Sequence, residues 1–131
     1  MKKLLISVSF ASVVLISACT RYTPNIYNVK NAQVVGQTTK PLSLSQVGHA
    51  IAAGGTSLGW NMNAVRPGYT VGTLDLRGNQ AKVGIRYNSK TYSIKYLSSK
   101  NLMKDGEIHK NYNGWIHNLD NAIKSRLLMS R

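Results

Sequence analysis

The sequence predicts a small α+β domain: a helix, a three- to four-stranded antiparallel β-meander and a C-terminal helix, with both helices packed on one face of the sheet. Residues 43–59 and 114–129 repeat apolar side chains at helical spacing. Between them, three segments alternate apolar and polar residues and are separated by short turn signals. A sheet with one apolar face and two amphipathic helices bury their apolar surfaces best against one another.

The first twenty residues predict export. Lys2 and Lys3 are followed by an apolar run, residues 4–16, that is shorter than the ~20 residues a membrane-spanning helix needs. Residues 1–18 are therefore predicted to be a signal peptide. The last residues before and at the cleavage point, Ile16-Ser17-Ala18-Cys19, resemble a bacterial lipobox, which implies lipidation of Cys19. A plain secretory signal that ends beside a cysteine is the alternative.

Cysteine usage favours the lipobox. Cys19 is the only cysteine, so no intramolecular disulfide can form in an oxidising compartment. Several acyl chains hold a protein on a membrane almost permanently. Because Thr20 is not the aspartate that retains similar lipoproteins in the inner membrane, we expect an outer-membrane anchor and a domain that faces the periplasm.

The mature chain is predicted to begin with a lipidated N-terminus and flexible tether, residues 19–40, followed by a single α+β domain, residues 41–131. The tether prediction rests on a polar composition with Pro24 and Gly36 and on the lack of a helical period. A short edge strand over residues 26–29 is the alternative for part of it.

The first helix is predicted from Ser43, whose spacing to Gln46 matches a capping box. Leu44, Val47, Ile51 and Leu58 then fall near one helix face. Each glycine of Gly54-Gly55 costs up to ~1 kcal/mol relative to alanine. We therefore expect the helix to end or kink there, with residues 56–60 as a separate turn.

The predicted strands are residues 70–76, 81–87 and 91–97, with residues 62–65 as a further candidate. Ala81, Val83 and Ile85 alternate with polar neighbours, as in an antiparallel sheet that is buried on one side. The last helix is predicted from about Gly114, with Asn113 as its N-cap.

The charge predicts an anionic partner. The formal net charge is +13, and signal cleavage removes only two of the positive charges. The predicted outer sheet face carries Lys82, Arg86 and Lys95, and its turns carry Lys90 and Arg77. This basic patch suits anionic lipid or lipopolysaccharide, whereas a merely solvated sheet face is the alternative. Nucleic acid is not expected, since the chain is exported and has no nucleic-acid-binding motif.

No catalytic or metal-binding motif is recognisable. His49, His109 and His117 have no metal-ligand spacing with cysteines or acids. Asp105, Glu107 and His109 would share one face of an extended segment, which could form an acid–base group. However, Asp105-Gly106 is a strong turn signal. We therefore expect an ordered loop, no cofactor and no metal.

The segment from residue 91 to residue 123 resembles a family of small lipoproteins of Gram-negative bacteria that are generally uncharacterised. The shared pattern follows a "GTLDL" strand, Gly72 to Leu76, and falls on Tyr92-Ser93-Ile94, Tyr96, Ser99, Asn101-Leu102, Asp105-Gly106, Ile108-His109, Asn111-Tyr112-Asn113, Trp115 and Asn118-Leu119. The resemblance implies a lipoprotein with a helix–meander–helix outline and implies no activity. It marks an interaction loop of Asp105, His109, Asn111, Tyr112 and Trp115.

These observations predict an outer-membrane-anchored, non-catalytic binding or envelope-structural module. Its expected partners are the membrane, through the anchor, and anionic lipid, lipopolysaccharide or an envelope protein. The alternative is an envelope hydrolase or hydrolase inhibitor that uses the loop of residues 105–112.

Overall fold

The computed structural model describes residues 21–34 and 40–130 and confirms the predicted α+β class. The predicted signal peptide and Cys19, the predicted lipidation site, lie outside these residues. Within them, a five-stranded antiparallel sheet has the strand order β2-β6-β5-β4-β3. The bounds are β2 Val29–Gln33, β3 Asn61–Arg66, β4 Tyr69–Leu76, β5 Asn79–Tyr87 and β6 Thr91–Lys100.

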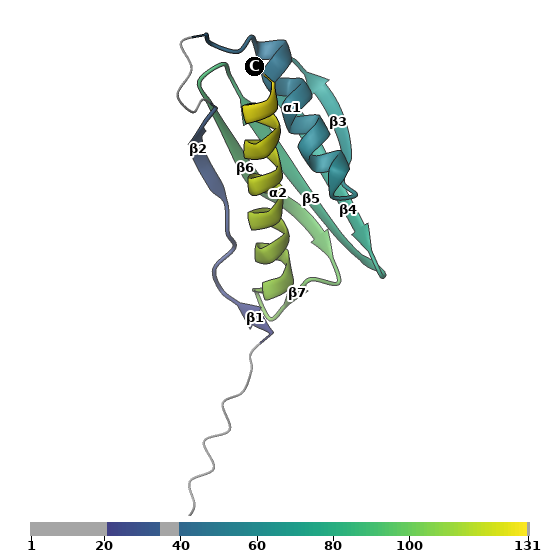
Figure 1. Ribbon diagram of the computed structural model, residues 1–131. Coiled ribbons are helices and arrows are strands. Elements are labelled where there is room, and N and C mark those ends of the chain that lie inside the picture. Colours follow the sequence, from purple (N-terminus) through teal and green to yellow (C-terminus); the bar gives the residue numbers. More distant parts are fainter. Residues whose placement is uncertain (1–20, 35–39, 131) are drawn as a thin grey trace, which may run out of the picture.

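Helices α1 (Leu44–Ser57) and α2 (Lys110–Met129) lie side by side on one face of this sheet, as Figure 1 shows. A second, small sheet at one end of the molecule has the order β1-β8-β7. Its strands are β1 Tyr22–Thr23, β7 Met103–Lys104 and β8 Glu107–His109.

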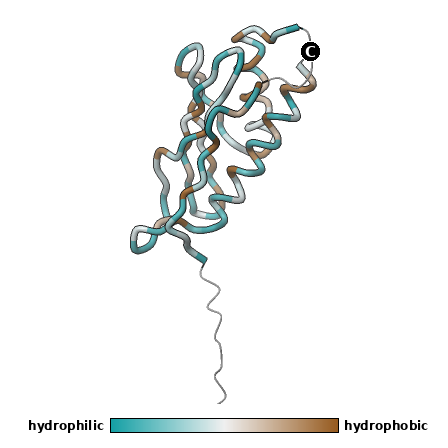
Figure 2. The backbone as a smooth tube through the Cα atoms, turned by 90° about the vertical axis from the view of Figure 1, so that its left-hand side faces the viewer, coloured by the Kyte–Doolittle hydropathy of each residue, from teal (hydrophilic) through white to brown (hydrophobic). Residues whose placement is uncertain are grey.

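The core lies between the five-stranded sheet and the helices. Hydrophobic and hydrophilic residues alternate along the chain (Figure 2). On β5, Ala81, Val83 and Ile85 are fully buried, as their alternation predicts, while Arg86 on the opposite face is exposed. The helices contribute the other side of the core, mainly through Val47, Ile51, Ile116, Leu119, Ile123 and Leu127.

Helix α1 begins as predicted but does not end or kink at the glycines. Ser43 Oγ accepts from Gln46 N at 3.1 Å and Gln46 Oε1 accepts from Ser43 N at 2.9 Å, which completes the capping box. The helix continues through Gly54-Gly55 to Ser57. A Cβ at position 54 would lie 2.9 Å from the backbone nitrogen of Ile123. The glycine is therefore needed for the close approach of α1 to α2.

The prediction of a flexible tether is wrong for residues 21–34. Tyr22–Thr23 pairs with β8, and Val29–Gln33 forms an edge strand of the five-stranded sheet next to β6. Val29 and Val34 are buried in the core. Two buried valines and two strand pairings hold this segment on the domain, so the domain includes residues that the sequence assigned to the tether. Residues 35–39 lie outside the described part of the chain.

Helix α2 begins four residues before the predicted start, and its N-cap is His109, not Asn113. His109 Nδ1 accepts a hydrogen bond from Asn111 N at 3.1 Å. Asn113 instead joins the helix to the segment between β1 and β2. Its Oδ1 accepts from Tyr27 N and its Nδ2 donates to Asn25 O, both at 2.9 Å.

Two tight hairpins lie at the same end of the molecule. The β4–β5 turn has φ of 52° at Arg77 and 81° at Gly78, and the β7–β8 turn has φ of 52° at Asp105 and 80° at Gly106. Positive φ at both central residues is typical of the type I′ turn, whose twist fits a two-residue hairpin. Asp105-Gly106 therefore forms a turn, as the sequence predicts. The small β7–β8 hairpin around this turn is not predicted.

Candidate anion-binding sheet face

The face of the five-stranded sheet that points away from the helices carries a row of cations around one aromatic ring. Strand register places Tyr69 of β4 between Arg66 of β3 and Arg86 of β5. The guanidinium carbon of each arginine lies 4.8 Å from the centroid of the Tyr69 ring. Because each cation–π contact contributes ~0.5–1 kcal/mol at an exposed site, the ring holds both guanidinium groups in place. We call these three residues the Arg–Tyr–Arg row.

Gly84 of β5 explains why the Tyr69 ring lies on the sheet. A Cβ at position 84 would be 2.8 Å from the Tyr69 hydroxyl oxygen and 3.1 Å from its Cε2. A glycine here leaves the space that the ring occupies. The ring in turn covers backbone that a glycine would otherwise expose to water.

A β-bulge brings Arg66 onto this face. Met62 and Ala64 of β3 pair with Gly72 and Thr70, whose positions are buried on the helix side. Strict alternation would put Arg66 on that side as well. The register shifts between Ala64 and Arg66, so that Arg66 pairs with Tyr69 instead. Re-aiming a side chain is a common role of bulges.

Two of the predicted cations extend the row. Lys95 pairs with Gly84, and Lys82 lies two residues before Gly84 on β5. The acidic residue on this face, within the described chain, is Asp75, whose Oδ1 accepts from Gln80 Nε2 at 2.8 Å. Neither Arg66 nor Arg86 has a carboxylate partner among the described residues. The face is therefore of nearly uniform positive charge.

The structure does not bring together all five predicted basic residues. Lys82, Arg86 and Lys95 share the outer face, whereas Arg77 precedes β5 and Lys90 follows it. A nine-residue strand at ~3.3 Å per residue separates these two by about 30 Å. Arg66 and Tyr69, which were not predicted, join Lys82, Arg86 and Lys95 on the outer face in place of Arg77 and Lys90. Tyr69 precedes the predicted strand of residues 70–76, and no local signal revealed the bulge that turns Arg66.

The residues of the predicted interaction loop do not converge on a common site. Asp105 occupies an exposed turn, Asn111 is exposed, and His109 caps α2 with its ring edge against Tyr22, 5.2 Å between centroids. Tyr112 is fully buried, and its hydroxyl has no hydrogen-bond partner among the described residues. Burial raises the pKa of Tyr112. Trp115 packs half-buried beside Leu58, Trp60 and Leu74.

Within residues 21–34 and 40–130, no three histidine, cysteine, aspartate or glutamate side chains come close enough to hold a metal ion. His49 is exposed on α1, and the His117 ring stacks on Tyr27 at 3.9 Å between centroids. In the same part of the chain, no helix combines the length and apolar character needed to cross a membrane.

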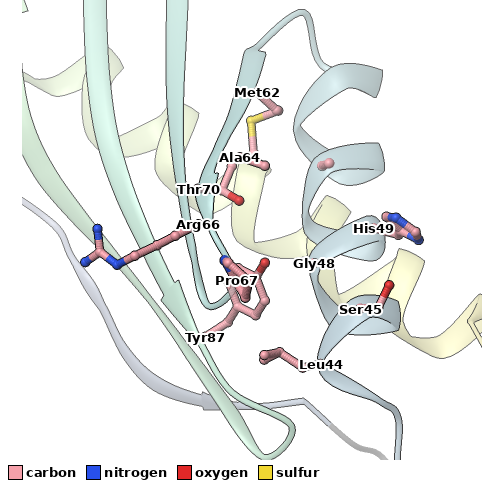
Figure 3. A pocket seen from close by; sticks show the side chains of 11 residues that line it. Leu44, Ser45, Gly48, His49, Met62, Ala64, Arg66, Pro67, Thr70 and Tyr87 are labelled. Atoms are coloured by element: carbon pink, nitrogen blue, oxygen red, sulfur yellow. The ribbon is translucent and has the colours of Figure 1, made fainter.

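A separate groove of about 580 Å³ runs between α1 and the β3–β4 hairpin. Its lining is mainly apolar and comes from Leu44, Gly48 and Ala52 of the helix and from Met62 and Ala64 of β3. Figure 3 shows that the Arg66 side chain extends away from α1. The charge of Arg66 therefore belongs to the outer sheet face and not to the groove.

One buried polar group escaped the sequence interpretation. Asp120 of α2 is 6% exposed, accepts from the Tyr92 hydroxyl through Oδ1 and from Lys124 Nζ through Oδ2 at 2.9 Å. Burial, together with the hydrogen bond to the Asp120 carboxylate and its charge, raises the pKa of Tyr92. The i, i+4 spacing of Asp120 and Lys124 was a usable signal for their ion pair. Lys124 is itself exposed, and its ion pair with Asp120 lies within α2. The hydrogen bond from Tyr92 to Asp120 is the contact that joins β6 to α2.

No protein-family model, no curated protein and no solved structure matches the chain. The resemblance to small lipoproteins stays a prediction.

Proposed function

We propose that the chain is an outer-membrane lipoprotein, anchored through Cys19 and facing the periplasm, whose domain is a non-catalytic binding module for phosphate-bearing envelope components. The Arg–Tyr–Arg row carries this proposal. Guanidinium groups bind phosphate with paired, directional hydrogen bonds, and here two of them stand against one ring on a face with little negative charge.

The lipid anchor rests on the lipobox-like residues 16–19 and on the lone cysteine. Incorporation of labelled palmitate, with loss in Cys19→Ala, is its test. A wild-type protein that incorporates no labelled palmitate would contradict the proposed lipid anchor.

Anion binding is tested with a non-lipidated mature chain, residues 19–131 carrying Cys19→Ala, which contains every described element. The probes are phosphatidylglycerol vesicles, lipopolysaccharide and phosphatidylcholine vesicles. Binding to the two anionic probes should weaken steeply with salt. The double variant Arg66→Gln/Arg86→Gln should weaken binding about tenfold or more, since each cation near an anionic surface contributes ~1 kcal/mol.

The matched control is Lys30→Gln/Lys90→Gln, which removes the same charge from exposed positions outside the row. An equal loss in the control would show that only net charge matters and would contradict a site at the row. A preference for lipopolysaccharide or for phosphatidylglycerol identifies the source of the phosphate.

The alternative of a hydrolase or hydrolase inhibitor has no geometric support. Asp105 forms a turn and His109 caps a helix, so the residues that would carry it already have structural roles.

A further inference from the structure

The pairing of β1 fixes where the chain enters the domain. Tyr22 and Thr23 pair with His109 and Ile108 of β8, and Arg21 O accepts a hydrogen bond from Lys110 N at 2.8 Å. Cys19 lies two residues before Arg21. Since a chain spans at most ~3.6 Å per residue, two residues cannot place Cys19 more than about 7 Å from Arg21. An anchor at Cys19 therefore has almost no tether.

Several elements meet at this end of the molecule. The start of α2 follows β8 directly, and the β7–β8 hairpin lies beside β1 (Figure 1). Asn101 Nδ2 donates to Gly78 O at 2.7 Å, which fixes the β4–β5 turn next to the start of β7. The C-terminus lies at the opposite end (Figure 1). We call the surface formed by β1, the β7–β8 hairpin, the β4–β5 turn and the first turn of α2 the anchor-proximal end.

The exposed side chains of the anchor-proximal end fit a lipid headgroup layer. Its exposed cations are Arg21, Arg77, Lys104 and Lys110, and its acids are Asp105 and Glu107, so positive charge prevails. Met103 is 42% exposed, and Tyr22 lies under the Lys104 ammonium, 5.9 Å from ring centroid to Nζ. Basic residues together with tyrosine and an apolar side chain are the composition that settles at a membrane interface.

We infer that the anchor-proximal end rests on the anionic headgroups of the leaflet that holds the Cys19 acyl chains, with the strands directed away from that leaflet. The inference rests on the proposed lipid anchor, and it draws on a surface other than the Arg–Tyr–Arg row. The short connection between Cys19 and Arg21 keeps the anchor-proximal end close to the leaflet. The positive charge of this end then favours contact with the anionic headgroups over free rotation of the domain about its anchor.

The orientation has a consequence for the Arg–Tyr–Arg row. On β5, Gln80 lies near the anchor-proximal end and Arg86 lies six residues further along. At ~3.3 Å per residue, the row is about 20 Å farther from the anchoring leaflet. That distance exceeds the Debye length of ~8 Å at physiological salt. The row is therefore beyond the electrostatic reach of the anchoring leaflet.

The test uses the lipidated mature protein in vesicles that contain phosphatidylglycerol and a headgroup-attached nitroxide quencher. A fluorophore is attached to Met103→Cys at the anchor-proximal end or to Ser45→Cys, an exposed position in the first turn of α1. This helix begins at the end of the molecule opposite β1 (Figure 1). Because Cys19 carries the lipid and is the only native cysteine, each label occupies one site. We expect strong quenching of the label at position 103 and little quenching of the label at position 45.

Charge dependence is the second measurement. Lys104→Gln/Lys110→Gln should reduce quenching of the position 103 label in anionic vesicles, and Lys30→Gln/Lys90→Gln should leave it unchanged. Equal quenching at positions 103 and 45, or stronger quenching at 45, would overturn the orientation while the anchor stands. Failure of the protein to carry palmitate would overturn the anchor and the orientation together. Neither outcome affects the solution test of the Arg–Tyr–Arg row.

Discussion

The hydroxyl of Tyr92, on strand β6, donates a hydrogen bond to the carboxylate of Asp120, on helix α2, across the interface between sheet and helix. Tyr92 is 1% exposed and Asp120 is 6% exposed. The second carboxylate oxygen accepts from Lys124, whose side chain reaches solvent. The carboxylate is therefore bound on both oxygens, and its bond to Tyr92 is the one that lies in the interior.

Tyr92→Phe should lower the free energy of unfolding by about 2 kcal/mol. The substitution keeps the ring but leaves a buried carboxylate oxygen without its donor, and hydrogen bonds to charged groups contribute ~1.5–3 kcal/mol. Urea denaturation followed by circular dichroism measures the change. A variant as stable as the wild type would show that the Asp120 carboxylate gains nothing from Tyr92.

Tyr112→Phe should leave stability unchanged or raise it by up to ~1 kcal/mol. Tyr112 is buried like Tyr92, but its hydroxyl has no partner among the described residues, so phenylalanine removes a buried polar group that makes no bond. The same denaturation experiment compares the two substitutions directly. A loss as large as that of Tyr92→Phe would contradict the assigned environment of Tyr112.

Stability should fall as the pH rises above about 10. Burial raises the pKa of Tyr92 and of Tyr112 above the ordinary value of 10.0, with the Asp120 carboxylate adding to the effect at Tyr92. Above pH 10 the unfolded chain releases these phenolic protons while the folded chain keeps them. The free energy of unfolding then falls by up to ~1.4 kcal/mol per pH unit for each tyrosine.

Urea denaturation at pH 8, 10 and 11 measures this slope, and Tyr112→Phe should make it shallower by the share of one tyrosine. Identical slopes in the wild type and in Tyr112→Phe would mean that Tyr112 ionises equally in both states.

Gly54→Ala should destabilise the protein by ~1–3 kcal/mol, because the added methyl group forces α1 away from the Ile123 backbone. Gly114→Ala is the matched control. It introduces the same methyl group into helix α2 where no atom lies within 4 Å, and it should stabilise by about 0.5–1 kcal/mol through helix propensity. Equal effects at the two positions would mean that α1 and α2 tolerate a wider separation. Thermal unfolding of both variants provides the comparison.

Gly84→Ala should weaken binding to anionic vesicles without any change in charge. The methyl group would displace the Tyr69 ring, so that Arg66 and Arg86 lose the surface that holds them. We expect a severalfold loss of affinity in the vesicle assay, with Gly114→Ala retaining wild-type affinity. If Gly84→Ala binds as the wild type does, the arginines act by charge alone and their arrangement around the ring is irrelevant.

The sequence predicts the fold where the determining interactions are local. The capping box at Ser43 and the alternation of Ala81, Val83 and Ile85 are visible in short windows, and both are confirmed. The role of Gly54 depends on its contact with Ile123 of the partner helix, which is distant in the sequence, so local helix propensity does not reveal it. The same holds for Val29 and Val34, whose burial depends on pairing with β6.

The candidate site likewise contains residues that the sequence predicts and residues that it does not. Alternation places Lys82, Arg86 and Lys95 on one face, and the register confirms that they share it. Arg66 joins them only because of a register shift, and a bulge has no signature in the apolar pattern. The N-cap of α2 is mispredicted for a related reason. Asn113 is a residue type that often caps helices, but here it is bonded to Tyr27 and Asn25, which are distant in the sequence.

The register shifts also affect how many copies of this protein can crowd together. Strands β2 and β3 are the two edges of the five-stranded sheet, and each carries a shift, between Val29 and Ala32 and between Ala64 and Arg66. A bulged edge cannot continue a regular ladder with the strand of a neighbour. Proteins confined to a plane meet edge to edge at high local density. With the proposed lipid anchor in place, these irregular edges should keep neighbouring domains separate on the membrane.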